Sequence, residues 1–123
     1  MIVAGTFRNI LDAAQNGQPF LVFFSGKQCS VCDVLKEKIN ALLAAKFPNF
    51  LAIEIDAEQD REAAGQHMVF TVPTILICSA EKELDRFGRN LTIHQLEHRL
   101  SLAERHHQIA SPDGSPQALP ATN

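Results

Sequence analysis

Apolar residues recur along the first half of the chain with two different spacings. Over residues 6–16, and again from Cys29 to Pro48, they return every three or four positions, which predicts two amphipathic helices. Between these helices, residues 20–24 (Phe-Leu-Val-Phe-Phe) are continuously apolar, which is typical of a strand buried on both faces. Residues 50–55 predict a second strand. The order strand, helix, strand favours two parallel strands joined by a right-handed crossover.

The second half of the chain predicts a short helix, a hairpin and a long helix. Residues 57–67 are mostly polar with two alanines inside, the pattern of a weakly amphipathic helix. Residues 74–78 predict a fully apolar strand, and residues 83–87 predict its antiparallel partner. Thr92 and Gln95 have the spacing of a capping box, which marks the start of the last helix.

These elements fit one domain with a tail. A chain of 123 residues has about the length of one domain, and the helix and strand patterns occupy residues 1–107. We expect an α/β fold with helices on both faces of a mixed sheet, which has four strands, or five if Met1–Val3 adds a short one. Residues 108–123 contain three of the six prolines together with several polar residues, and they predict a flexible Pro/Ser-rich C-terminal tail.

Composition and charge exclude several classes of protein. Hydrophobic residues make up 46% of the chain, enough for a packed core, so the chain is not disordered as a whole. The net charge of −3 argues against a nucleic-acid platform and against attraction to anionic membranes. No apolar run reaches the roughly 18 residues of a membrane-spanning helix, and the first residues show no secretory leader. We therefore expect a cytoplasmic protein without nucleic-acid or membrane partners.

The strongest chemical signal is the motif Cys29-Ser-Val-Cys32, which lies between a buried strand and the start of a helix. The free N–H groups and the dipole of a helix N-terminus favour a thiolate, so we expect the pKa of Cys29 to lie below the free value of about 8.5. Cys29 is then the exposed nucleophile that attacks a disulfide, and the more shielded Cys32 resolves the mixed disulfide. The motif thus predicts a redox-active disulfide.

Metal binding is an alternative use of two nearby cysteines. A structural zinc ion needs four ligands. The third cysteine, Cys78, stands alone in an apolar strand, where a free thiol acts as a small hydrophobic side chain. His94 and His98 are four residues apart, but exposed histidines on a polar helix face are common. We expect neither a metal site nor a bound cofactor, and an inert thiol pair stays a further alternative.

Several of these segments, taken in order, resemble thioredoxin over about residues 5–107. They are the run from Phe20 to Cys32, the strand that ends near Asp56, the Val72-Pro73-Thr74 turn before an apolar strand, and the closing hairpin and helix. The resemblance implies a thioredoxin-like three-layer α/β/α fold in which Pro73 is cis and lies beside the redox pair. It also implies that the backbone of Val72 pairs with an extended substrate segment. Of the phenylalanines, Phe70 is the best candidate to line the substrate groove.

The chain departs from the thioredoxin pattern at positions that matter for catalysis. The family's buried Asp, six residues before the first Cys, is Phe23 here, and its Lys partner is Ala52. Because that Asp is thought to take the proton from the resolving cysteine, Cys32 lacks this base. Glu54, on the same side of the strand as Ala52, is a substitute candidate. The Trp that precedes the first Cys in the family is Gln28.

The resemblance implies a thiol–disulfide oxidoreductase that reduces or exchanges disulfides of proteins or small thiols. Its electrons would come from a thiol reductase or a small thiol. A different class of function stays open beside it, because the loss of the buried Asp and Lys suits a thioredoxin-like adaptor or chaperone that binds peptides with low redox turnover. Transient metal handling by the two thiolates is a third alternative.

Overall fold

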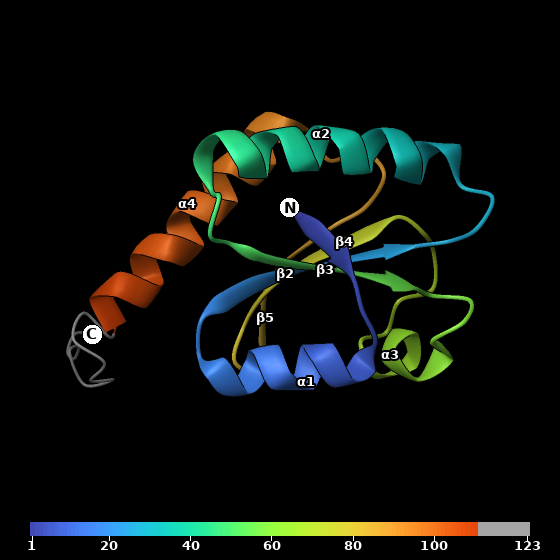
Figure 1. The fold of residues 1–123 in the computed structure, drawn as a ribbon, viewed down its shortest axis with the longest axis horizontal. Helices are drawn as coiled ribbons and strands as arrows, with labels where there is room; N and C mark the ends of the chain where they lie inside the picture. Colours follow the sequence, from blue (N-terminus) through green and yellow to red (C-terminus); the bar gives the residue numbers. More distant parts are fainter. Residues whose placement is uncertain (111–123) are drawn as a thin grey trace.

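A single sheet lies between two layers of helices, with α2 and α4 on one face and α1 and α3 on the other (Figure 1). The structure is a computed structural model, and it describes residues 1–110. The expected three-layer α/β/α arrangement is confirmed. In chain order the elements are β1 (Ile2–Ala4), α1 (Phe7–Asn16), β2 (Pro19–Ser25), α2 (Ser30–Lys46), β3 (Leu51–Asp56), α3 (Arg61–Gln66), β4 (Thr74–Ser79), β5 (Lys82–Phe87) and α4 (Ile93–Ala110).

The five strands run in the order β1-β3-β2-β4-β5. β1, β3 and β2 are parallel neighbours, whereas β4 is antiparallel to β2 and β5 is antiparallel to β4. The expected mixed sheet is confirmed, and its fifth strand is the short β1, which pairs Ile2 with Ala52 and Ala4 with Glu54. β2 therefore lies in the middle of the sheet and leads the chain directly to the candidate site.

The central strand β2 divides the core into two parts. All seven of its residues are buried, because helices cover both faces of the sheet at this position. Leu21 and Phe23 enter the core beside α2 and α4, while Phe20, Val22 and Phe24 enter the core beside α1 and α3. The continuous apolar run in the sequence thus belongs to a strand without a solvent-exposed face.

The short helix α3 begins later than its sequence pattern predicts. It starts at Arg61 rather than near residue 57. The Asp56 carboxylate accepts hydrogen bonds from the backbone N–H groups of the two residues at 58 and 59, and this turn delays the helix. Asp60 then caps the helix by accepting a hydrogen bond of 3.1 Å from the N–H of Ala63.

The last helix, α4, starts at the predicted capping box and ends later than expected. Thr92 and Gln95 exchange two hydrogen bonds of 3.1 Å between their side chains and backbone N–H groups. The helix continues to Ala110, beyond the expected end of the domain at residue 107. The remainder of the predicted tail, residues 111–123, lies outside the described residues. Within residues 1–110, none of the helices combines the length and the apolar composition that a membrane crossing requires.

Candidate redox site

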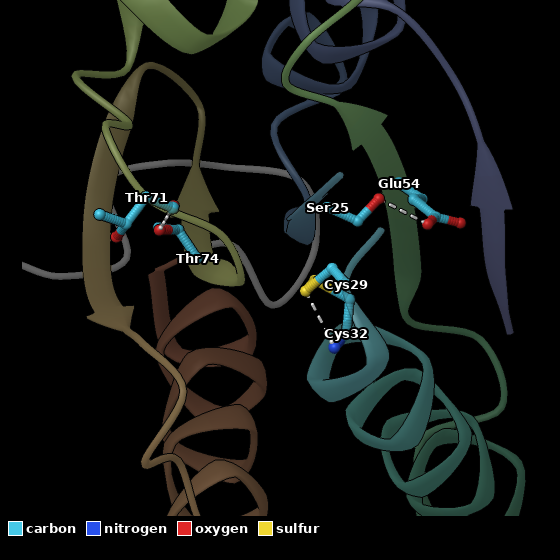
Figure 2. Close-up of a disulfide and its surroundings, with 6 residues drawn as sticks. All are labelled: Ser25, Cys29, Cys32, Glu54, Thr71 and Thr74. Carbon is cyan, nitrogen blue, oxygen red and sulfur yellow. Dashed lines mark hydrogen bonds between the residues drawn. A yellow bond between two sulfur atoms is a disulfide. The ribbon is translucent and has the colours of Figure 1, made fainter. Parts of the chain in front are cut away.

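The turn from β2 into α2 places the two cysteines of the Cys-x-x-Cys motif. Cys29 is the N-cap residue of α2, with extended backbone angles, and Cys32 lies in the first helical turn. A disulfide bond joins them, with their Cα atoms 5.2 Å apart. The backbone N–H of Cys32 donates a hydrogen bond of 3.2 Å to the Cys29 sulfur (Figure 2). The disulfide of the predicted redox pair is therefore present in the structure.

The two cysteines differ in their exposure to solvent. Cys32 has 2% of its surface exposed and packs in the core between the sheet and α2, whereas Cys29 is partly exposed. A disulfide in solution can therefore reach Cys29 first. After reduction, the free N–H groups at the start of α2 stabilise negative charge on the Cys29 sulfur. This arrangement can carry out thiol–disulfide exchange in two steps, with Cys29 exposed for attack and Cys32 shielded behind it.

A second loop, between α3 and β4, lies against the turn that leads from β2 into α2. The Val72–Pro73 peptide bond in this loop is cis, as the resemblance implies. A Cβ atom built on Gly26, in the turn that leads into α2, would lie 3.2 Å from a Val72 methyl group, so the two loops are in close contact. The Thr74 hydroxyl donates a hydrogen bond of 2.7 Å to the carbonyl of Thr71, closing the turn around the proline (Figure 2).

Phe70 belongs to the same loop and is not part of the core. Its exposed fraction is 87%, whereas five other phenylalanines of the chain are buried. Among the described residues, the Phe70 ring is not buried against a neighbour and therefore adds little to the stability of the fold. It is available for contact with a ligand. The structure therefore places Phe70, Val72 and Pro73 on one loop, and the Val72 side chain beside the turn before Cys29.

The core beneath Cys32 is apolar where the thioredoxin pattern has a charged pair. Phe23 and Ala52 have exposed fractions of 0% and 1%, and both pack in the same core as Cys32. A carboxylate lies further along the sheet. Glu54 accepts a hydrogen bond of 2.8 Å from the Ser25 hydroxyl (Figure 2) and one of 2.6 Å from the Lys36 ammonium group. In place of a buried charged pair, the chain thus has a partly exposed ion pair between Lys36 on α2 and Glu54 on β3.

Lys36 connects this carboxylate to α2, the helix that carries Cys32. It follows Cys32 by one helical turn on α2, and residues four apart lie on the same face of a helix. Lys36 thus ties Glu54 to α2 one helical turn beyond Cys32. Sequence reasoning selected Glu54 but missed its two partners. The four-residue spacing of Cys32 and Lys36 was the one signal that pointed to this contact.

Sequence reasoning also missed Arg86, a β5 side chain that holds the loop ahead of the cis-proline. Its guanidinium group donates hydrogen bonds to the carbonyl oxygens of His67 at 2.6 Å and Met68 at 3.1 Å. It also contacts both carboxylate oxygens of Glu83, at 2.8 and 2.9 Å, and this hydrogen bonding lowers the pKa of Glu83. Met68 has a left-handed backbone with φ of 53°, so Arg86 binds the loop where the chain turns sharply.

The third cysteine lies apart from the redox pair, on the other side of the sheet. Cys78 packs in the core next to α1 and α3, and burial raises the pKa of its thiol to about 12. It lines a cavity of about 450 Å³ together with His67, whose ring packs between Phe7 and Phe24. Burial lowers the pKa of His67. Cys78 is therefore a protonated, inert thiol at neutral pH, as expected for a hydrophobic role.

Metal ligands do not gather at either cysteine site. Within residues 1–110, no group of three or more His, Cys, Asp and Glu side chains has an arrangement that could hold a metal ion. Cys29 and Cys32 are bonded to each other, and Cys78 lies in the other core.

Comparison with known proteins gives consistent matches. The family model described as thioredoxin matches residues 2–101. The chain is 32% identical over 84 residues to the thioredoxin-like protein YdfQ of Bacillus subtilis strain 168, covering 68% of this chain and 74% of that protein. It is 27% identical over 86 residues to thioredoxin of Chlamydia trachomatis serovar D, covering 70% and 82% of the two chains. The X-ray structure of Fasciola hepatica thioredoxin superposes with a TM-score of 0.67 at 26% identity, covering 87% of this chain and 99% of that one.

The matched region contains the whole candidate site. Residues 2–101 run from β1 into α4 and include the cysteine pair, the cis-proline loop and all five strands. The relatives named thioredoxin are matched over most of their length, so the similarity extends over the domain and not over one motif. The chain belongs to the thioredoxin family and carries a Cys-x-x-Cys redox pair within that fold.

Proposed function

We propose that the protein is a thiol–disulfide oxidoreductase that reduces or exchanges disulfides of proteins or small thiols. One observation carries the proposal. Cys29 is the partly exposed N-cap residue of α2, and its disulfide partner Cys32 is buried in the first turn of the helix. An exposed nucleophile and a shielded resolving thiol are the two parts that disulfide exchange requires. No bound cofactor enters the reaction.

The reaction starts from the reduced dithiol. The Cys29 thiolate attacks one sulfur of the substrate disulfide, that disulfide breaks, and its second sulfur leaves as a thiolate that takes a proton from water. Cys32 then loses its proton and attacks the Cys29 sulfur, which forms the Cys29–Cys32 disulfide and releases the first substrate sulfur. Two electrons have moved from the dithiol to the substrate. A thiol reductase or a small thiol then reduces the pair again.

The loop between α3 and β4 supplies the substrate contacts in this proposal. The backbone of Val72, before the cis-proline Pro73, pairs with an extended substrate segment that carries the reacting cysteine. The exposed Phe70 ring packs against the same segment. We place the protein in the cytoplasm, where the small-thiol pool keeps such a pair mainly reduced.

An insulin-reduction assay with dithiothreitol as electron donor tests the proposal. The wild-type protein should accelerate insulin precipitation, and Cys29→Ser should abolish the acceleration. In a separate incubation without dithiothreitol, the pre-reduced Cys32→Ser protein should accumulate a covalent mixed disulfide with insulin, visible as a mass shift that added dithiothreitol removes. Cys78→Ala is the matched control, because it removes a thiol from the other core and should retain activity. Turnover that survives Cys29→Ser would overturn the proposal.

A peptide-binding adaptor is the second candidate, and two observations favour it. Phe23 and Ala52 leave Cys32 without the buried charged pair of the thioredoxin pattern, and Phe70 presents an exposed apolar ring. Fluorescence polarisation with a labelled extended peptide separates the two functions. Binding that persists in Cys29→Ser and is lost in Phe70→Ser, together with slow insulin reduction, would favour the adaptor. Binding that depends on Cys29 favours the enzyme.

A further inference from the structure

A groove beside the redox pair contains none of the residues proposed above for substrate pairing. It has a volume of about 660 Å³ and lies between the first turns of α2 and the segment that leads into α4. Ser30 and Val31, the two residues between the cysteines, form part of its wall. A substrate bound through Cys29 therefore lies within reach of this groove.

The lining of the groove is mostly apolar on both sides. α2 contributes Val34 and Leu35, and the opposite side contributes Leu91 and Ile93. Val34 has an exposed fraction of 54%, although the other large apolar residues in the middle of α2 are buried. Burial of such surface by a ligand is favourable in proportion to the apolar area removed from water. The groove therefore favours an apolar side chain as its occupant.

Two cations border this apolar lining. Lys38 on α2 and Arg89 in the segment before α4 both line the groove and are exposed. Among the described residues neither one forms an ion pair, whereas Lys36, Lys46 and Arg86 do. The described residues that line the groove include no acidic side chain. The groove therefore has uncompensated positive charge, although the chain as a whole has a net charge of −3.

We propose that this groove binds the flank of a disulfide substrate in which an apolar side chain lies next to Asp or Glu, close to the reacting cysteine. The inference rests on the proposed redox function and deepens it, because it names the substrate class. The apolar side chain packs between Val34 and Leu91, and the carboxylate pairs with Arg89 or Lys38. The same charges attract an acidic segment during encounter, so they raise the association rate as well as the affinity.

A single turnover of the reduced protein tests this proposal without a further reductant. The probes are synthetic peptides with one cysteine, blocked as a mixed disulfide with 2-thiopyridine. Attack of Cys29 on the peptide sulfur forms the Cys29–peptide disulfide and releases 2-thiopyridone, which is followed by its absorbance. Cys32 then attacks Cys29 and releases the peptide thiol. Two electrons pass from the dithiol to the mixed disulfide, so the reaction is balanced.

Three peptides separate the apolar and the charged contributions. The first carries Leu-Asp beside the cysteine, the second Leu-Lys, and the third Ser-Asp, with all other residues identical. Each second-order rate constant is divided by that of the same protein with 2,2′-dipyridyl disulfide, a small neutral substrate that cannot fill the groove. This ratio removes any effect of a substitution on the reactivity of Cys29 itself.

The substitutions Arg89→Glu, Lys38→Glu and Val34→Ser test the two sides of the groove. For the Leu-Asp peptide, each charge reversal should lower the ratio about fivefold, which corresponds to one ion pair of roughly 1 kcal/mol. For the Leu-Lys peptide, the reversals should raise the ratio. Val34→Ser should lower it for the two leucine peptides and leave the Ser-Asp peptide unchanged. Arg8→Glu, an equal charge change on the exposed surface of α1, is the control and should change no ratio.

The outcomes distinguish a failure of the groove from a failure of the redox function. Equal ratios for all three peptides in the wild type would overturn the proposed substrate class. A preference that persists in the Arg89→Glu, Lys38→Glu double variant would overturn it as well. If neither the peptides nor dipyridyl disulfide react in a manner that depends on Cys29, the proposed function fails and this inference fails with it.

Discussion

The ammonium group of Lys36 lies 2.6 Å from a carboxylate oxygen of Glu54, and this contact ties the first turns of α2 to the end of β3. The Glu54 side chain is 21% exposed, and its other oxygen accepts a hydrogen bond from Ser25 at the end of β2. Three elements, β2, β3 and α2, therefore hold this one carboxylate in place. As the substitute candidate for the missing buried Asp, Glu54 is expected to accept the proton that Cys32 must lose before it resolves a mixed disulfide.

Replacing Glu54 by Gln should slow the resolving step by about 100-fold, because an amide does not accept that proton. Dipyridyl disulfide reports both steps in stopped-flow kinetics, since attack by Cys29 releases the first thiopyridone and attack by Cys32 releases the second. The first phase should keep its rate, and the pH dependence of the second phase should change. Glu37→Gln, on the exposed side of α2, is the control. Equal slowing of both phases would indicate a merely structural role for Glu54.

Cys29 should be a stronger acid than a free thiol. The N–H of Cys32 points to its sulfur at 3.2 Å, and the helix dipole adds to this stabilisation of the thiolate. Titration of thiolate absorbance near 240 nm in the Cys32→Ser, Cys78→Ala protein should give a pKa below about 8.5. Asp33→Asn removes a negative charge from the first turn and should lower the pKa of Cys29 further. A value at or above that of the free thiol would contradict the activated nucleophile.

Removing Arg86 should loosen the loop that carries Phe70 and the cis-proline. Arg86→Met loses the hydrogen bonds to the carbonyls of His67 and Met68, so the free energy of unfolding should fall by about 1 kcal/mol. The KM for insulin should rise several-fold with a smaller change in kcat, because in the proposed function this loop binds the substrate and does not react. Lys82→Met, on the same strand, is the control. Arg86→Lys should rescue little, since an ammonium group lacks the guanidinium fork.

His67 should make the protein less stable as the pH falls. Burial lowers its folded pKa below the unfolded value of 6.5, so the unfolded chain binds the extra proton first and stability is lost between the two values. The loss for one such group has a slope of at most about 1.4 kcal/mol per pH unit. His67→Phe, which keeps an aromatic ring between Phe7 and Phe24, should flatten the stability curve below pH 6.5 in urea titrations. An unchanged curve would contradict the burial of the imidazole.

The main strands and helices could be predicted because their patterns are long and regular. The strand β2 buries a continuous apolar run between turn residues, and the helix α2 buries apolar residues that recur every three or four positions. The strand β1 could be suggested only as an option, since a segment of three residues is too short to show a periodic pattern of apolar residues. It forms because β3 offers a free edge, and because the Ile2 N–H donates a hydrogen bond of 2.8 Å to the Asn40 side chain of α2.

The candidate site could be predicted where its chemistry depends on residues close in sequence. Cys29 and Cys32 are three positions apart, so one motif shows both of them. Arg86 could not be found in this way, because it binds backbone carbonyls 18 and 19 residues away, and any residue type provides a carbonyl. The partners of Glu54 could not be predicted either, because they lie on a helix and on another strand, far from Glu54 in the sequence.

The position of Cys29 directly after the central strand has a consequence for the motions of the protein. β2 is paired with β3 on one side and β4 on the other, and every one of its residues is buried. Amide hydrogens in such a strand exchange with solvent only when the whole domain opens. We therefore expect a change of oxidation state to alter the local fluctuations of the first turn of α2 and its neighbouring loops, while the amide hydrogens of β2 keep their protection. If the pair cycles as proposed, the sheet should keep its slow hydrogen exchange in both the oxidised and the reduced protein.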